Sequence, residues 1–338
     1  MTQVRRGSYA LVPLADTADT GAFRFAGFEP YVASINDAGV VAFQATLTGG
    51  GSGVFSAAAD GSLSTVIDPA GGPFGEIVSH PDINRDGSSC FYASPRPGGR
   101  VVALVRDGET FRLHEAAGPL GPTINEAGAV AFRVEPEAGH GGILTGYHGA
   151  VRSVADTRDG RFSAFHGLPV INGAGSVAFR ADLRAGGEGI YLDDRGSLTT
   201  MTETGELFAG LGAFPVIDDA GSVAFCATTP DGRSGVFTVT DGRVATVIDS
   251  RGQFESFRGV LLANVGRVVF YATPRGGQLG VFSGPDPIAD RLLGLGATLF
   301  GSTVVDFALN PVSINHAGQL AIRVKLADEQ QLVLRADP

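Results

Sequence analysis

A nine-residue string recurs seven times along the chain, and this repeat limits the possible folds more than any other feature. Each copy starts with Ile-Asn or a close variant, turns at a glycine and continues into apolar residues. The copies are INDAGVVAF from Ile35, INRDGSSCF from Ile83, INEAGAVAF from Ile124, INGAGSVAF from Ile171, IDDAGSVAF from Ile217, LANVGRVVF from Leu262 and INHAGQLAI from Ile314, so that successive copies begin 41 to 52 residues apart. A four-stranded propeller blade takes about 40 to 50 residues. The sequence therefore predicts an all-β protein, a seven-bladed β-propeller.

Each repeat reads as one blade of four strands. In the fourth copy we expect a short inner strand over 168–171, a turn at Asn172-Gly173-Ala174-Gly175 and a second strand over 176–183. Such a turn favours Asn or Asp near its start and a glycine in the left-handed region of backbone conformation, where a Cβ atom would clash with the backbone. GIYLDD and LTTMTE supply the third and the outer strand. Aromatic residues at the links between blades should pack as wedges: Phe23, Phe74, Phe162 and Phe254.

The seventh repeat lacks its outer strand, because the chain ends at EQQLVLRADP. The segment 8–16, SYALVPLAD, resembles the outer strands of other repeats, so we expect it to complete the last blade and close the ring. One domain over 1–338 follows. Its blades are expected at 22–68, 74–116, 119–156, 162–203, 208–249, 254–293 and 300–338 together with 8–16.

Composition narrows the compartment and the partners. The formal net charge of −10 disfavours nucleic acid as a partner, since such proteins usually present a basic field. Cys90 and Cys226 occupy repeats that are not neighbours, so we expect buried free thiols. No apolar stretch is long enough for a signal peptide or a membrane span, and no Cys or His spacing suggests zinc. We expect a cytoplasmic monomer without metal, cofactor or membrane association.

The repeated strings resemble a family of bacterial proteins whose units carry I-N-D-A-G-x-V-A-F. The resemblance extends from Gly21 to the C-terminus and includes GVFSGPDPIADRLLGLGATLFGSTV, from Gly280, ahead of INHAGQLAIRVKLADEQQLVL. It implies a propeller fold. It supplies no catalytic residues, since members of this family are mostly without assigned activity. Members are typically secreted or surface-directed, but this sequence has no recognisable secretion signal.

Propellers bind ligands mainly at one mouth of the central channel, and we expect the links between blades to line that mouth. The Ile-Asn-x-x-Gly turns should lie on the opposite face, where their Asn and Asp act as turn formers. The candidate site consists of the link residues that differ from one repeat to the next. The residues that would transfer protons or orient the imidazoles are His166, His80, Glu76 and Glu255. Those assigned to substrate binding are Arg24, Glu29, Arg258, Asp306 and His114.

Two functions are favoured on the sequence alone over a third, a secreted surface protein of the kind that the resemblance implies, which the missing signal segment disfavours. The first is an enzyme of lyase, isomerase or cyclase type that uses these acid–base residues on a small molecule in the channel, for example in bacterial specialised metabolism. The second is a non-catalytic scaffold that binds a protein or a glycan, since a fold does not imply a function. The absence of Trp and the low Tyr count, 6, weaken a lectin interpretation. The string Asp82-x-Asn84-x-Asp86-Gly87 resembles the start of a calcium loop, but Ala93 stands where a Glu is needed, so a turn is favoured.

Overall fold

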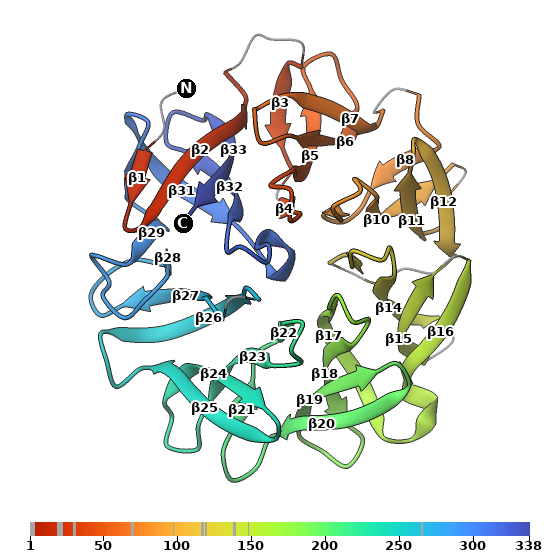
Figure 1. Ribbon diagram of the computed structural model, residues 1–338, viewed down its shortest axis with the longest axis vertical. Coiled ribbons are helices and arrows are strands. Elements are labelled where there is room, and N and C mark those ends of the chain that lie inside the picture. The colour runs from red at the N-terminus through yellow and green to blue at the C-terminus, as the bar shows by residue number, and fades with distance from the viewer. Residues whose placement is uncertain are drawn as a thin grey trace.

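The computed structural model describes residues 4–18, 23–29, 32–68, 71–96, 98–115, 118, 120–137, 140–147, 149–264 and 266–338. Seven antiparallel sheets stand around a central axis like the blades of a propeller (Figure 1). The predicted all-β, seven-bladed architecture is confirmed. The blade limits expected at 22, 116 and 119 fall outside the described residues. No helix in the described part of the chain is long and apolar enough to cross a membrane.

The fourth blade shows the plan of the repeat. Its strands follow one another outwards from the axis in chain order: β17 (Phe162–Ile171), β18 (Val177–Leu183), β19 (Glu188–Asp194) and β20 (Ser197–Glu203). A short 3-10 helix, η1 (Thr157–Asp159), precedes it. The inner strand begins at Phe162, six residues before the predicted start, because the backbone pairs with β18 on both sides of a register shift between His166 and Val170.

The other complete blades repeat this plan, with the inner strand broken in three of them. Blade 1 comprises β3 (Phe25–Phe28), β4 (Ser34–Ile35), β5 (Val41–Leu47), β6 (Ser52–Ala57) and β7 (Leu63–Ile67). Blade 2 comprises β8 (Phe74–Ile77), β9 (Asp82–Ile83), β10 (Ser89–Pro95), β11 (Val101–Arg106) and β12 (Glu109–His114). Blade 3 comprises β13 (Thr123–Ile124), β14 (Val130–Glu137), β15 (His140–Tyr147) and β16 (Ala150–Asp156). Blade 5 comprises β21 (Gly210–Leu211), β22 (Val216–Ile217), β23 (Val223–Thr228), β24 (Ser234–Thr240) and β25 (Arg243–Asp249). Blade 6 comprises β26 (Phe254–Leu262), β27 (Val268–Pro274), β28 (Gly280–Phe282) and β29 (Arg291–Gly294).

Proline accounts for where several of these short inner segments begin. Pro81, Pro122 and Pro215 stand directly before β9, β13 and β22. Because proline has no N–H to give to a sheet ladder, strand pairing stops at these positions and resumes after them. The result is a kinked inner strand that turns a few side chains towards the axis.

The last blade is shared between the two ends of the chain. Its strands are β31 (Ser302–Ala308), β32 (Leu320–Leu326), β33 (Gln331–Asp337) and β2 (Tyr9–Asp16), with β30 (Thr298–Leu299) and β1 (Val4–Arg6) at its edges and the 3-10 helix η2 (Pro311–Ser313) near the axis. The red β2 lies beside the blue β33 in Figure 1, and Ala10 pairs with Asp337. The predicted closure of the ring by the N-terminal strand is confirmed.

Aromatic triads fill the blades. In blade 4, the ring centroids of Phe162, Phe179 and Tyr191 lie 4.9 to 6.0 Å apart, and blades 5 and 6 repeat the arrangement with phenylalanine alone. Edge-to-face contacts of this kind add about 1 kcal/mol each to the burial of the rings. The predicted wedges Phe74, Phe162 and Phe254 are buried, whereas in blade 1 the deeply buried residue is Phe25 and Phe23 packs partly exposed against it.

The asparagine of each turn joins neighbouring blades. Within the turn, Asn125 Oδ1 accepts hydrogen bonds from the N–H groups of Ala127 and Ala129, so it is the turn former that the sequence predicts. Its Nδ2 donates across the blade boundary to the carbonyl of Asn172. The same bond to the next blade occurs at five of the seven junctions, donated by Asn36, Asn84, Asn125, Asn172 and Asn315.

Blades 5 and 6 interrupt this circle, because Asp218 and Ala263 stand where the other blades have asparagine. Asp218 still accepts from the N–H of Ser222, but an ionised carboxylate has nothing to donate to blade 6. Replacing Asp218 with Asn supplies the missing donor, and replacing Asn172 with Asp removes an existing one. We expect D218N to raise and N172D to lower the free energy of unfolding, each by about 1 kcal/mol. Urea unfolding of both variants at pH 7 measures this, and a shift of the two in the same direction would contradict the role of the circle.

Candidate functional site

Two cavities lie on the propeller axis, one at each end. The cavity at the turns, here the acidic mouth, has a volume of about 110 Å³ and is lined by the turn residues of the blades. The second, here the funnel, has a volume of about 260 Å³ and is lined mainly by the links between blades. Pro311 of η2 contributes to both walls, so this short helix lies between the two cavities.

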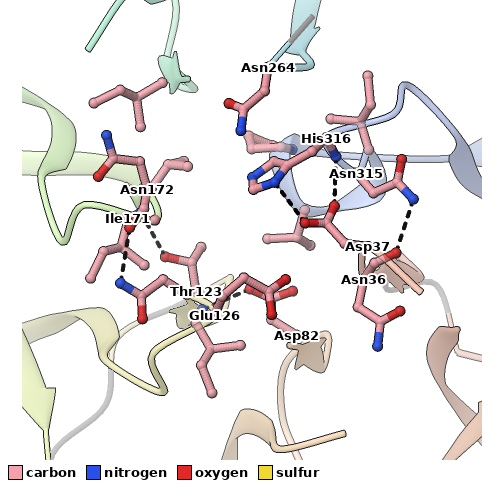
Figure 2. Close-up of a pocket in the computed structure, with 18 of the residues that line it drawn as sticks. Asn36, Asp37, Asp82, Thr123, Glu126, Ile171, Asn172, Asn264, Asn315 and His316 are labelled. Carbon is pink, nitrogen blue, oxygen red and sulfur yellow. Dashed lines mark hydrogen bonds and ion pairs between the residues drawn. The ribbon is translucent and has the colours of Figure 1, made fainter. Parts of the chain in front are cut away.

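The residue that follows the turn asparagine, or its equivalent in blades 5 and 6, lines the acidic mouth in every blade except blade 2 (Figure 2). At this position the side chain of one blade accepts a hydrogen bond from the backbone N–H of the preceding blade, as Glu126 does from Arg85 at 2.8 Å and Asp219 from Gly173 at 2.7 Å. Asn264 takes the corresponding bond from Asp219, and Asp37 takes it from His316. Carboxylates therefore gather at the opening because each satisfies an N–H of its neighbour.

His316 connects three blades across this opening. Its Nδ1 lies 2.7 Å from Asp37 Oδ2 and its Nε2 lies 3.7 Å from Asp219 Oδ2. The hydrogen bond to Asp37 raises the pKa of His316, and although burial opposes it, the same bond holds the pKa of Asp37 below its ordinary value. Burial raises the pKa of Glu126. In the mouth, carboxylates thus surround an imidazole whose protonated form they favour.

Asp82 lies deeper in the acidic mouth. Its carboxylate is buried and accepts from the N–H groups of Ile83 and Ile124, yet burial raises its pKa to about 7. Asp82 lies in the short strand β9, and its bond from Ile124 links blade 2 to blade 3. Among the described residues, no group of three or more His, Cys, Asp or Glu side chains has the arrangement needed to hold a metal ion.

The funnel is mostly apolar, and every blade contributes to it. Its wall consists of Val32, His80, Leu120, Leu168, Phe214, Arg258, Gly259, Val260, Tyr271, Leu309, Asn310 and Pro311. Concave apolar cavities with a few inward polar groups are the usual form of small-molecule sites. The polar groups in this wall therefore decide what the funnel can bind.

His80 is the buried polar group of the funnel wall on blade 2. Its side chain is 3% exposed, and burial lowers its pKa to about 4, so the ring is neutral at pH 7. Nδ1 lies 3.2 Å from the carbonyl oxygen of Pro81, an atom that only accepts, which assigns the proton to Nδ1 and leaves a lone pair on Nε2. Nε2 has no hydrogen-bond partner among the described residues.

Tyr271 is the second such group, on blade 6. The equivalent tyrosine in blade 2, Tyr92, donates its hydroxyl to the carbonyl of Arg133 and accepts from the N–H of the same residue. The hydroxyl of Tyr271 has no such partner within the described chain. Burial raises the pKa of Tyr271 well above its ordinary value, so the phenol keeps its proton.

Glycines pack closely against both rings. A Cβ on Gly121 would lie 2.6 Å from His80 Nε2, and a Cβ on Gly259 would lie 2.7 Å from the ring of Tyr271. Real Cβ atoms essentially never make contacts this short. Any larger residue at Gly121 or Gly259 would therefore displace the adjacent ring. The close packing limits how far either ring can rotate.

Arg258 supplies the positive charge of the funnel. The register of β26 against β27 shifts between Phe257 and Gly259, which leaves Arg258 as the extra residue of a β-bulge. The bulge turns its exposed side chain towards the axis, where it lines the funnel. No carboxylate of the described residues forms an ion pair with it.

Of the nine residues predicted for the site, the funnel unites two, His80 and Arg258. The others lie outside both cavities. His166 pairs with Asp182 at 2.7 Å, Asp306 pairs with Arg323, Glu29 accepts from Thr46, and His114 packs on the ring of Phe132. The remaining three are exposed: Arg24 before β3, Glu76 on β8 and Glu255 on β26.

Sequence reasoning missed Tyr271 and the acidic mouth. Tyr271 follows the apolar string of its repeat, at the position where other blades have Gln, Arg, Cys or Tyr. The residue after the turn asparagine also varies, from Asp37 and Glu126 to His316. Both positions break the repeat, which is the feature that could have pointed to them, but they lie in strands and turns rather than in the links.

The fold and its axial cavities define a class, the single-ring seven-bladed β-propeller. No known protein family and no curated protein matches the sequence. Among solved structures, the chain is similar to an oligogalacturonate lyase from Vibrio parahaemolyticus, with 9% identity and a TM-score of 0.60 over 99% of this chain and 96% of the other. An oligogalacturonate lyase in complex with manganese gives 11% identity and a TM-score of 0.58 over 100% and 96%. A puromycin-hydrolyzing peptidase from Mycobacterium tuberculosis gives 14% and 0.56 over 90% of this chain and 50% of the other. At such identities the likeness establishes the fold.

Burial of neutral His80 makes the protein sensitive to acid. The imidazole has a lower pKa in the folded state, about 4, than its ordinary value of 6.5. Below pH 6.5 the unfolded chain therefore binds the proton more strongly, and stability is lost as the pH falls from 6.5 towards 4. Between pH 7 and pH 5 this loss is about 2 kcal/mol. We expect the neutral variant His80→Gln to remove this part of the acid sensitivity in urea unfolding at the two pH values. An unchanged pH dependence would show that His80 is not buried and neutral.

The His316–Asp37 pair gives a second titration. We expect NMR to find the pKa of His316 above 6.5 in the native protein. Replacing Asp37 with Asn removes the carboxylate that accepts from the imidazolium, and the pKa of His316 should fall. Replacing Asp219, whose oxygen is more distant, should lower it by less. A larger effect from Asp219→Asn would contradict the geometry of the acidic mouth.

Proposed function

We propose that the chain is an enzyme of lyase, isomerase or cyclase type that carries out acid–base chemistry on a small molecule in the funnel. One observation carries the proposal: His80 and Tyr271 line the same apolar cavity, and the Nε2 of the first and the hydroxyl of the second are buried with unused hydrogen-bonding capacity. Leaving a buried polar atom without a partner costs about 1 to 3 kcal/mol. A substrate that bonds to both atoms would recover this cost.

The three polar side chains have different roles in this proposal. His80 Nε2 carries a lone pair and accepts a proton from the substrate, most readily from a carbon next to a carbonyl group. The Tyr271 phenol donates to the oxygen on which negative charge then develops. Arg258 holds an anionic group of the substrate. The abstracted proton returns to another atom of the substrate or leaves with the departing group, so no redox cofactor is required.

Substrate binding would adjust the basicity of His80. In the empty funnel the pKa of about 4 makes the imidazole a weak base. A carboxylate bound by Arg258 in the same cavity favours the imidazolium, because an opposite charge in a medium of low dielectric stabilises the protonated ring. The pKa of His80 would then rise towards neutrality only when substrate is present.

The fold is compatible with this chemistry, since oligogalacturonate lyase uses a similar ring. The alternative is a propeller that binds a small molecule without converting it. The two functions differ in whether a C–H bond of the ligand is broken. Hydrogen–deuterium exchange at the ligand therefore separates them.

A library of small carboxylic acids incubated with the protein in D₂O and followed by proton NMR tests the proposal. We expect at least one acid to exchange a C–H proton, and the rate to fall at least about 100-fold in His80→Gln. Tyr271→Phe, which keeps the ring and loses the hydroxyl, should also slow exchange. His140→Gln is the matched control, because His140 is exposed on β15 outside the funnel. Exchange that survives in His80→Gln refutes the proposal, and binding without exchange favours the non-catalytic alternative.

A further inference from the structure

The chemistry of the funnel wall defines the class of ligand that it fits. Seven of its residues are apolar: Val32, Leu120, Leu168, Phe214, Val260, Leu309 and Pro311. Three charged or titratable side chains share the cavity, and only Arg258 carries charge at pH 7, because His80 is neutral and Tyr271 is protonated. An apolar body with a single negative charge is complementary to such a wall.

The volume of the funnel sets the size of that body. A cavity of 150 Å³ lined by apolar side chains accommodates benzene. The funnel, at about 260 Å³, therefore has room for one ring with a short side chain, or for an aliphatic chain of similar volume. Oligosaccharides and peptides are too large to be enclosed.

Leu120 contributes an apolar side chain to the funnel from an unfavourable backbone conformation. Its φ of 81° lies in the left-handed region, which is unfavourable for a branched side chain. Its side chain is 37% exposed and lines the funnel next to Gly121, the glycine that packs on His80. Strain of this kind concentrates at ligand-binding positions. A leucine thus occupies this position next to Gly121, although its backbone conformation favours glycine or asparagine.

We propose that the funnel binds a small amphiphilic monocarboxylate of about ten non-hydrogen atoms, with its carboxylate on Arg258 and its apolar body against Leu120 and Phe214. This ligand class rests on the proposed function for its site, the funnel, and adds the chemistry of the substrate. His80 and Tyr271 line the same cavity, so a hydroxyl or carbonyl group of the ligand that reaches Nε2 or the phenol would satisfy these atoms.

Three probes with one body and different head groups test the ligand class: 3-phenylpropionate, 3-phenylpropanol and 3-phenylpropylamine. We expect isothermal titration calorimetry to show the acid binding at least about tenfold more tightly than the alcohol, and the amine most weakly. Equal binding of acid and alcohol, preference for the amine, or no binding of the acid would each overturn the proposal.

Two variants assign the head group and the body to their residues. Arg258→Gln should abolish the advantage of the acid and leave the dissociation constant of the alcohol unchanged. Leu120→Asn, which suits a left-handed backbone and removes the apolar side chain, should weaken acid and alcohol by the same factor. Arg243→Gln, on the exposed face of β25, is the control and should change neither. If the acid keeps its advantage in Arg258→Gln, the assignment of Arg258 is refuted.

Failure of the ligand class and failure of the enzyme proposal give different results. His80→Gln and Tyr271→Phe should leave the preference for acid over alcohol in place while they slow C–H exchange. Binding that depends on Arg258 without any exchange refutes the enzyme and supports the ligand class. Exchange of a neutral compound that does not depend on Arg258 refutes the ligand class and supports the enzyme.

Discussion

The hydrogen bond from a turn asparagine to the next blade is the interaction on which the rest of the structure depends. A blade is a small sheet that cannot bury both of its faces alone, so its position is defined only by its neighbours. Asn125 and its equivalents satisfy their own turn with Oδ1 and fix the angle to the next blade with Nδ2. The closing strand β2 joins the two ends of the chain within the last blade by pairing with β33. Residues from all seven blades can then face one axis at defined distances.

A repeated scaffold of this kind separates structural positions from functional ones. Tyr92 and Tyr271 occupy equivalent strand positions, yet the first completes a contact between blades, whereas the second lines the funnel and its hydroxyl has no partner among the described residues. Arg258 reaches the axis because β26 bulges where the pairing with β27 shifts. Each departure weakens the repeat locally, and the remaining junctions compensate for that loss. Function can therefore be placed at a few positions while the ring stays closed.

The architecture was predictable from sequence, and the site only in part. The seven turns and the closing N-terminal strand could be predicted because each depends on local sequence: the turn residues recur within every repeat, and the N-terminal segment resembles the outer strands. The side of a link that faces the axis depends instead on bulges and proline breaks, which change register by one residue and exchange the inward and outward faces. His80 stands directly before the break at Pro81 and Arg258 lies in a bulge, and both line the funnel. Glu76 lies beside a register shift of β8 and Glu255 at one of β26, yet both face solvent, so the presence of a shift does not by itself decide which side chains reach the axis. The acidic mouth depends on contacts between blades that no single repeat contains.

The two ends of the axis have opposite chemistry, and this difference constrains how a ligand reaches the funnel. Asp37, Glu126 and Asp219 surround the acidic mouth, and Pro311 lies between it and the funnel. An anion approaching from that end meets like charges in a narrow opening, so the proposed carboxylate has to enter from the side of the links. The net charge of −10 also means that long-range attraction does not accelerate its association. Selectivity for the anion then arises at the funnel, where Arg258 supplies the positive charge of a largely apolar wall.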